Sequence, residues 1–301
     1  MGYNTQPMPI QQAKKNSSES PIIIDSTTLE LNIAWDKVAP LYKKTVAKLA
    51  SKIKLDGFRL GKAPLHLAKD NLDQQYLTQE VLNQLLPSIY ADLIKKNNLK
   101  PISDPEFEPV QLDEGKEWRL KVRVAEKPSV SIKNYREVVK KARAVAKKTL
   151  ADQAKNKQPE KKVPTQTEEN SIILQTIYRN LVTQFRPQVP ELLLKQETRS
   201  ELQHLAERIE KSGISLDTFL SKTNQSFEKL SNDTAIAVLG RIQLGFILGE
   251  VAKEEKIEVS EAELRAGLQN QPEAHRDHQH LINAVHAQLM QQKIAEHLLR
   301  I

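Results

Sequence analysis

The apolar residues of this chain repeat with two different periods before residue 125, but with only one period after residue 170. Alternation of apolar and polar residues, typical of half-buried strands, runs from Ser26 to Ala34, around Phe107–Leu112 and over Trp118–Val124. Spacings of three and four residues predict helices over about 36–49 and 77–97. Residues 25–138 are therefore predicted to form an α+β domain with the order strand, helix, loop, helix, hairpin.

Helical spacing alone continues from Ser171 to the C-terminus. Gly213 is expected to end one of these helices, and Ser260 with Glu263 to form a capping box at the start of another. The fold class predicted for the chain is an α+β N-terminal domain followed by an all-α C-terminal domain over residues 170–301.

The stretch between the two domains is strongly basic. Between Lys140 and Lys162 it holds two acids, Asp152 and Glu160, against nine Lys and Arg, namely Lys140, Lys141, Arg143, Lys147, Lys148, Lys155, Lys157, Lys161 and Lys162. The rest of the chain is balanced, so this stretch accounts for the net charge of +7. Residues 139–169 are predicted to be a basic linker or a solvated helix, which serves either as an electrostatic tether to an anionic surface or as a spacer.

Composition excludes several classes of protein. Without cysteine, the chain has no disulfide framework, thiolate zinc site or cysteine nucleophile. Residues 1–24 begin with a polar stretch without the apolar core of a signal peptide and are predicted to be a disordered tail. No stretch approaches the ~18 apolar residues of a membrane span, so no membrane contact and a cytoplasmic location are expected.

The segment most suggestive of function is the loop Gly57-Phe58-Arg59-Leu60-Gly61-Lys62-Ala63-Pro64. Its two glycines and its proline break the helical period, which places the segment in a shaped surface loop. Phe58 offers an apolar anchor, Arg59 a planar fork for phosphate or carboxylate, and Lys62 a point charge. This combination suits a ribonucleoprotein surface.

The same loop resembles the ribosome-binding signature of the trigger factor family of bacterial nascent-chain chaperones. The predicted order of elements over residues 25–138 is similar to the ribosome-binding domain of that family. Val189–Leu193, Leu239–Ala252 and Ile257–Ser260 look like its C-terminal domain. The resemblance implies that Gly57, Phe58, Arg59, Gly61, Lys62 and Pro64 bind ribosomal protein and RNA near the exit tunnel, and that nascent or unfolded polypeptides are the clients.

Two departures from the family pattern are expected to matter. Leu60 stands where relatives often have a lysine, which removes one cation from the loop. Relatives also insert an FKBP-like prolyl isomerase domain between the two halves, whereas only about 30 polar, Lys-rich residues separate Val138 from Ser171 here. The resemblance therefore implies a chaperone without isomerase activity and without any cofactor.

Other readings of the sequence rest on weaker patterns. The loop lacks the four residues between glycines and the Ser or Thr after lysine that a P-loop requires, so nucleotide binding and an ATP cycle are not expected. His275, Asp277, His278 and His280 form a cluster that an exposed polar segment explains as well as a metal site does. The main alternative is an RNA-binding or ribosome-assembly protein that uses the basic stretch. The residues that would contact clients are not distinguishable from core residues by spacing.

Overall fold

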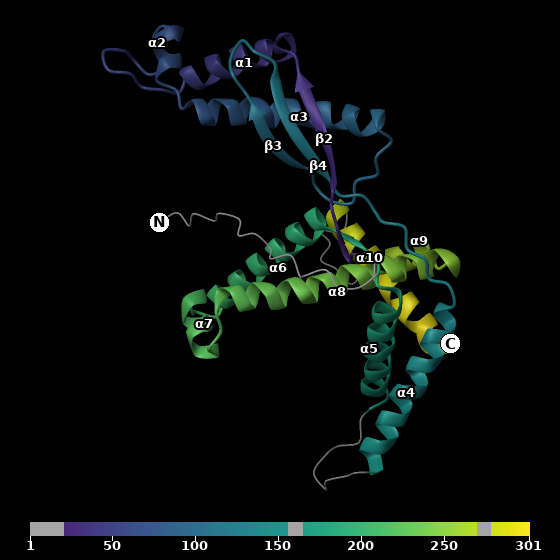
Figure 1. Cartoon of the computed structure of the whole chain (residues 1–301). Coiled ribbons are helices and arrows are strands. Elements are labelled where there is room, and N and C mark those ends of the chain that lie inside the picture. The colour runs from purple at the N-terminus through teal and green to yellow at the C-terminus, as the bar shows by residue number, and fades with distance from the viewer. Residues whose placement is uncertain (1–20, 156–164, 270–277) are drawn as a thin grey trace.

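The computed structural model describes residues 21–155, 165–269 and 278–301, and it shows an N-terminal α+β domain above a helical C-terminal domain (Figure 1). The N-terminal domain contains β2 (Thr27–Ile33), α1 (Trp35–Ala50), α2 (Leu65–Asp70), α3 (Gln74–Lys96), β3 (Glu106–Gln111) and β4 (Trp118–Val124). The C-terminal domain contains α4 (Tyr135–Lys155), α5 (Gln166–Phe185), α6 (Glu191–Lys211), α7 (Leu216–Thr223), α8 (Phe227–Glu254), α9 (Glu261–Gln269) and α10 (Gln279–Arg300). The predicted fold class is confirmed.

The N-terminal domain is a three-stranded antiparallel sheet covered by α1 and α3. The strand order is β2-β4-β3, so the predicted hairpin forms and β2 returns to pair with its second strand. Along β4 the alternation is complete: Trp118, Leu120, Val122 and Val124 are buried, and the residues between them face the other side. These side chains form one core with α1 and α3, including Val38 and Leu77.

The C-terminal domain consists of helical hairpins. One hairpin pairs α4 with α5, a second pairs α6 with α8 and carries α7 at its tip, and α9 and α10 pack together (Figure 1). Ile177, Leu181, Ile247 and Leu298 have essentially no exposed surface, and they bring α5, α8 and α10 into a single core. The predicted capping box at Ser260 and Glu263 and the helix end before Gly213 are both present.

Residues 139–155 correct the prediction of a linker or a solvated helix. They belong to α4, whose Val139, Ala142 and Ala146 are buried against Ile173 and Ile177 of α5. Small alanine side chains make this apolar face inconspicuous in the sequence, and it becomes buried only because α5 packs closely against it. The end of the predicted linker is also helical, because Thr165 forms a capping box with Glu168 and α5 follows at once.

The chain just before β2 joins the two domains. Residues 23–24 fall within the predicted disordered tail, but they form β1 (Ile23–Ile24), which pairs in parallel with β5 (Val189–Pro190). Pro21 and Ile22 of the same predicted tail also contact the chain around β5, and residues 1–20 lie outside the described residues. Arg123 of β4 adds ion pairs to Glu106 of β3 and to Glu191 of α6, at 3.1 and 3.0 Å.

Helix α8 revises the expectation that no segment approaches a membrane span. It is the one helix in the described part of the chain that is long and apolar enough, by length and composition, to cross a membrane. Helices inside the core of a domain pass the same test, and α8 packs Val238, Ile247 and Val251 into the C-terminal domain.

Candidate functional site

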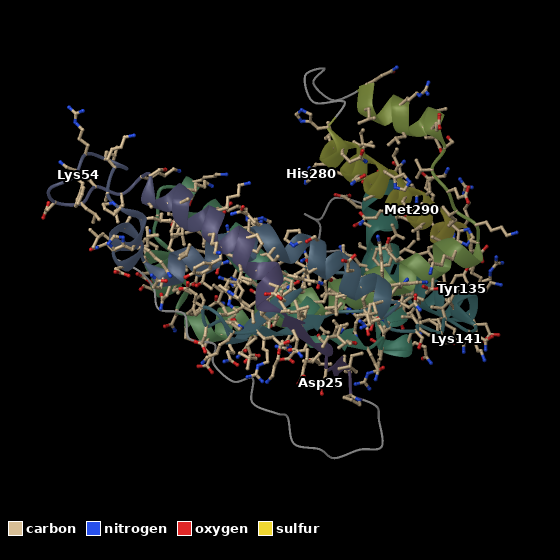
Figure 2. The ribbon with its side chains drawn as sticks, turned by 90° about the horizontal axis from the view of Figure 1, so that it is seen from above. Asp25, Lys54, Tyr135, Lys141, His280 and Met290 are labelled. Atoms are coloured by element: carbon tan, nitrogen blue, oxygen red, sulfur yellow. The ribbon has the colours of Figure 1, made fainter. Side chains whose placement is uncertain are left out.

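The candidate loop connects α1 to α2 at the end of the N-terminal domain that points away from the helical domain (Figure 1). Seen from above, Lys54 of this loop marks one extreme of the molecule (Figure 2). No other described element covers the loop, so it is accessible to a large partner.

Hydrogen bonds and two left-handed glycines shape the loop. The backbone N–H of Phe58 donates to the carbonyl of Leu55 at 3.0 Å, and that of Lys62 donates to the carbonyl of Arg59 at 2.9 Å. Gly57 and Gly61 have φ of +81° and +68°, a region that L-residues with side chains rarely adopt. The N–H of Gly61 also reaches the carbonyl of Ile53 at 3.3 Å and so closes the loop across its base.

These turns present apolar side chains to solvent. Phe58 is 39% exposed and Leu60 is 62% exposed, so the predicted anchor does not tuck into its own domain. Leu65 and Leu67, on the short helix α2, are exposed as well. The sequence pattern did not single out these two leucines, which are exposed because the six-residue helix α2 buries only Ala68.

Cations surround this apolar surface. Lys52, Lys54, Arg59 and Lys62 are exposed, and none of them forms an ion pair with another described residue. Asp56 is the only acid between residues 51 and 69. The site is therefore apolar at its centre and positive at its rim, which fits a partner with anionic groups around an apolar contact.

A hydrogen-bonded contact fixes the base of the site. Glu114, in the turn between β3 and β4, accepts a hydrogen bond from the hydroxyl of Tyr42 at 3.1 Å and pairs with the ammonium of Lys69 at 2.6 Å. Burial, and then the charge of Glu114, raise the pKa of Tyr42 to about 12, so its hydroxyl remains a donor at neutral pH. These contacts hold α2 against α1, and they fix the return arm of the loop while its tip stays exposed.

Of the residues predicted for this site, Phe58, Arg59, Lys62 and Pro64 are all exposed, and the two glycines shape the turns between them. Pro64 occupies the cap position just before α2.

The basic stretch is not part of this site. Lys141 of α4 lies at the opposite extreme of the molecule from Lys54 (Figure 2). Lys140, Lys141, Lys147 and Lys148 are exposed, and none pairs with an acid among the described residues. Lys157, Lys161 and Lys162 lie outside the described part of the chain.

The histidine cluster is only partly described. His278 occupies the cap position of α10 and His280 is exposed on its first turn, whereas His275 and Asp277 lie outside the described residues. Within residues 21–155, 165–269 and 278–301, no group of three or more metal-binding side chains comes together.

Comparison with known proteins supports the resemblance seen in the sequence. The family described as "Bacterial trigger factor protein (TF)" matches residues 24–158, and the one described as its C-terminus matches residues 139–300. The trigger factor of Clostridium kluyveri is 33% identical over 147 residues, which is 48% of this chain and 34% of that protein. The trigger factor of Corynebacterium jeikeium is 27% identical over 119 residues, or 40% of this chain and 23% of that protein. The matches thus span about a third or less of these curated relatives.

A solved structure agrees in fold over most of both chains. It is a trigger factor chaperone described for promiscuous substrate recognition in folding and assembly, and it matches with a TM-score of 0.52 at 14% identity. The match covers 91% of this chain and 96% of the other. The family model of the trigger factor C-terminus alone matches more than half of the residues of this chain. The chain therefore belongs to the trigger factor family of bacterial chaperones.

Proposed function

We propose that this protein docks on the ribosome near the exit tunnel, and there binds nascent or unfolded polypeptides without ATP and without its own isomerase activity. The observation that carries the proposal is Phe58, an aromatic side chain held exposed between two left-handed glycines and flanked by unpaired cations. An exposed phenylalanine in so well-shaped a loop is best explained by a partner that covers it.

Each part of the loop has a distinct task in this proposal. Phe58 and Leu60 form the apolar contact with ribosomal protein, and Leu60 adds to its area although it removes a cation. Arg59 and Lys62 pair with ribosomal RNA phosphates or acidic side chains. The cytoplasm is the compartment in which such a partner is met.

The helical domain supplies surface for clients. Phe227 and Ile236 of α8 are 54% and 69% exposed, although α8 is the most apolar helix of the domain. A client that is bound through many weak apolar contacts can dissociate without ATP hydrolysis, because no single contact is strong. The trigger factor of known structure is described for promiscuous substrate recognition, and this similarity supports the proposal that the clients are of unrelated sequence.

Isomerase activity is not expected because of the connection between α4 and α5. Only residues 156–165 separate the two helices, and a catalytic domain of even about 50 residues does not fit in that interval. The check is refolding of a protein whose slow phase is limited by a prolyl bond, where this chain should leave the rate unchanged. Faster refolding that persists after rigorous purification would contradict the proposal.

Co-sedimentation with ribosomes tests the docking site. Phe58→Ala with Arg59→Ala should weaken binding by about tenfold or more, because the variant loses both the apolar anchor and the planar cation. Phe227→Ala with Arg265→Ala removes the same two residue types from exposed positions in the helical domain and should bind like the wild type. Equal binding by the two double variants would overturn the assignment of the loop.

A further inference from the structure

The start of helix α6 is capped by a residue from the N-terminal segment of the chain. Pro190 occupies the cap position of α6 and makes no side-chain cap hydrogen bond. The hydroxyl oxygen of Ser26 accepts instead, from the backbone N–H of Leu192 at 3.1 Å. Ser26 is 8% exposed and directly precedes β2 of the N-terminal domain. A first-turn N–H requires such an acceptor, because it has no partner within its own helix.

Backbone pairing holds the chain before β2 at this place. The N–H of Val189 donates to the carbonyl of Ile22 at 2.7 Å, beside the pairing of β1 with β5. The side-chain amide of Gln188 donates to the carbonyl of Pro21 at 3.1 Å. The chain before β2 therefore extends below the sheet and into the helical domain (Figure 1). We call residues 21–26 the strap.

An alternating row of charges links the same helix to the sheet. Glu191, in the first turn of α6, pairs with Arg123 of β4 at 3.0 Å. Arg123 pairs with Glu106 of β3 at 3.1 Å, and Glu106 pairs with Lys195, one turn further along α6, at 2.7 Å. These four residues are called the charge row. Between 26% and 45% of each of their side chains is exposed, so salt weakens the attraction between them.

The apolar part of the junction is small. Ala125 and Ile102 of the N-terminal domain share one apolar cluster with Leu192, Leu193 and Phe246 of the helical domain. Each domain also has its own core, so the two domains can move relative to each other without unfolding. Leu192 and Leu193 lie in the turn of α6 that the strap caps. Movement of the strap therefore affects the cap and the apolar contact together.

The second connection between the domains is anchored differently. Lys127, in the segment between β4 and α4, pairs with Glu250 of α8 at 2.6 Å. Ile132, further along the same segment, is buried in the core of the helical domain. Because an apolar side chain fixes it there, this segment stays attached at high salt and serves as a pivot.

We infer that the strap and the charge row act together as a releasable clasp on the first turn of α6. With the clasp closed, the N-terminal domain has one orientation relative to the helical domain, and α6 is capped. With the clasp open, the N-terminal domain reorients about residues 125–134, and Leu192 and Leu193 become exposed. The clasp is a conformational device of the chain itself, which depends neither on ribosome docking nor on client binding.

Distances between the domains test the clasp in the full chain, which has no cysteine of its own. Nitroxide labels at Gln84→Cys of α3 and Gln203→Cys of α6, both exposed positions, are measured by pulsed electron paramagnetic resonance. Ser26→Ala with Glu106→Gln should widen the distance distribution about twofold or more, because the variant loses the cap and the carboxylate that bridges two cations.

A matched control removes the same two groups within the helical domain. Ser215 caps α7, and Glu263 pairs with Lys293 of α10. Ser215→Ala with Glu263→Gln should leave the distance distribution as narrow as in the labelled wild type. Equal widths for the two double variants would overturn the inference.

Salt opens the clasp without a substitution in it. At about 1 M NaCl the Debye length falls to about 3 Å, so the distribution of the labelled wild type should widen. Glu106→Gln, which lacks the centre of the charge row, should respond less to the same change. A wild-type distribution that is identical at low and high salt would contradict the clasp.

Hydrogen exchange tests whether the strap and the first turn of α6 move together. Amides of Glu191–Lys195 should exchange about fivefold faster in Ser26→Ala, because the N–H of Leu192 loses its acceptor. Ser26→Thr, which keeps the hydroxyl, should exchange like the wild type. Amides at the start of α7 should be unchanged in both variants. Wild-type exchange at the start of α6 in Ser26→Ala would refute the coupling.

Discussion

At the scale of single residues, the two glycines of the loop between α1 and α2 differ in what surrounds them. A β-carbon added to Gly57 would meet no atom within 4 Å, whereas one added to Gly61 would overlap the carbonyl of Ser51 at the end of α1. Both positions have positive φ. Gly57 therefore only permits a conformation, while Gly61 also permits a close approach of two backbone segments.

This difference predicts unequal effects of the same substitution. Gly57→Ala should cost about 1–2 kcal/mol, the strain of a left-handed alanine, and should largely preserve the loop. Gly61→Ala should displace the loop from Ser51 and weaken ribosome binding clearly more than Gly57→Ala does. Co-sedimentation measures the binding, and urea unfolding monitored by circular dichroism measures the stability. Identical ribosome affinity for the two variants would contradict a role for the Ser51 contact.

At the scale of elements, α4 combines a buried apolar face with an exposed basic one. Val139 and Ala142 pack on α5, while Lys140, Lys141 and Lys148 face solvent. The position of α4, at the far end of the molecule from Lys54, separates its charge from the surface on which the loop would dock (Figure 2). Exposed charges farther apart than the ~8 Å Debye length at physiological salt interact only weakly.

The basic face of α4 is therefore predicted not to contribute to ribosome docking through the loop. Replacing Lys140, Lys141, Arg143, Lys147 and Lys148 by glutamine should change ribosome affinity by less than about twofold and leave its salt dependence unchanged. The measurement is co-sedimentation over a range of salt concentrations. A flatter salt slope would show that these cations contact the RNA and would support the tether. Binding of naked RNA that these substitutions abolish would favour the alternative RNA-binding function.

One carboxylate links α9 to α10. Glu263 accepts hydrogen bonds from the N–H and hydroxyl of Ser260, and it pairs with the ammonium of Lys293 on α10 at 2.8 Å. The ion pair with Lys293 and the bonds from Ser260 lower the pKa of Glu263 to about 2. Gly267 lets α10 approach closely, because an added β-carbon there would lie 2.8 Å from Val285.

The lowered pKa predicts the direction of a pH effect. The folded state favours ionised Glu263, so its contribution to stability is present above the unfolded pKa of 4.5 and is lost as pH falls towards about 2. Glu263→Gln should reduce the loss of stability over this interval. Urea unfolding at several pH values between 5 and 2 tests the effect in both proteins. Parallel pH profiles for wild type and variant would show that Glu263 titrates normally.

At the scale of the whole molecule, the interface between the two domains is small and combines apolar contacts with an ion pair. Ala125 and Ile102 of the N-terminal domain contact Leu192 and Phe246 of the helical domain. Arg123 bridges the same boundary through Glu191. The helical domain also includes α4, so the C-terminal folding unit begins before residue 139.

This extent predicts which C-terminal fragment folds. A fragment of residues 128–301 retains α4 and should unfold cooperatively and suppress aggregation of an unfolded client. A fragment of residues 170–301 lacks α4, whose Val139 and Ala142 belong to the same core as Ile173 and Ile177 of α5, so it exposes part of that apolar face and should be less stable. Urea unfolding by circular dichroism compares them. Equal midpoints would show that α4 is dispensable.

The sequence alone predicted the main elements and the exposed loop at residues 57–64. Periodicity reports which residues share a face, so it predicted the strands at 26–34 and 118–124, the helices that follow and the change to an all-helical domain. Glycines and a proline around Phe58 predicted an exposed shaped loop, since those residues act on the local backbone whatever the tertiary context.

Only the tertiary structure decided which faces meet. The alanines of α4 led to the prediction of a solvated linker. A side chain as small as alanine is buried or exposed according to how closely a neighbouring helix approaches, and the sequence of α4 does not show that distance. Ser26 caps α6 at a residue 166 positions away in the chain, so this contact becomes visible only when the two segments are brought together. The local sequence pattern determines the conformation of each segment. Packing between segments that are distant in sequence depends instead on the shapes of the two surfaces that meet.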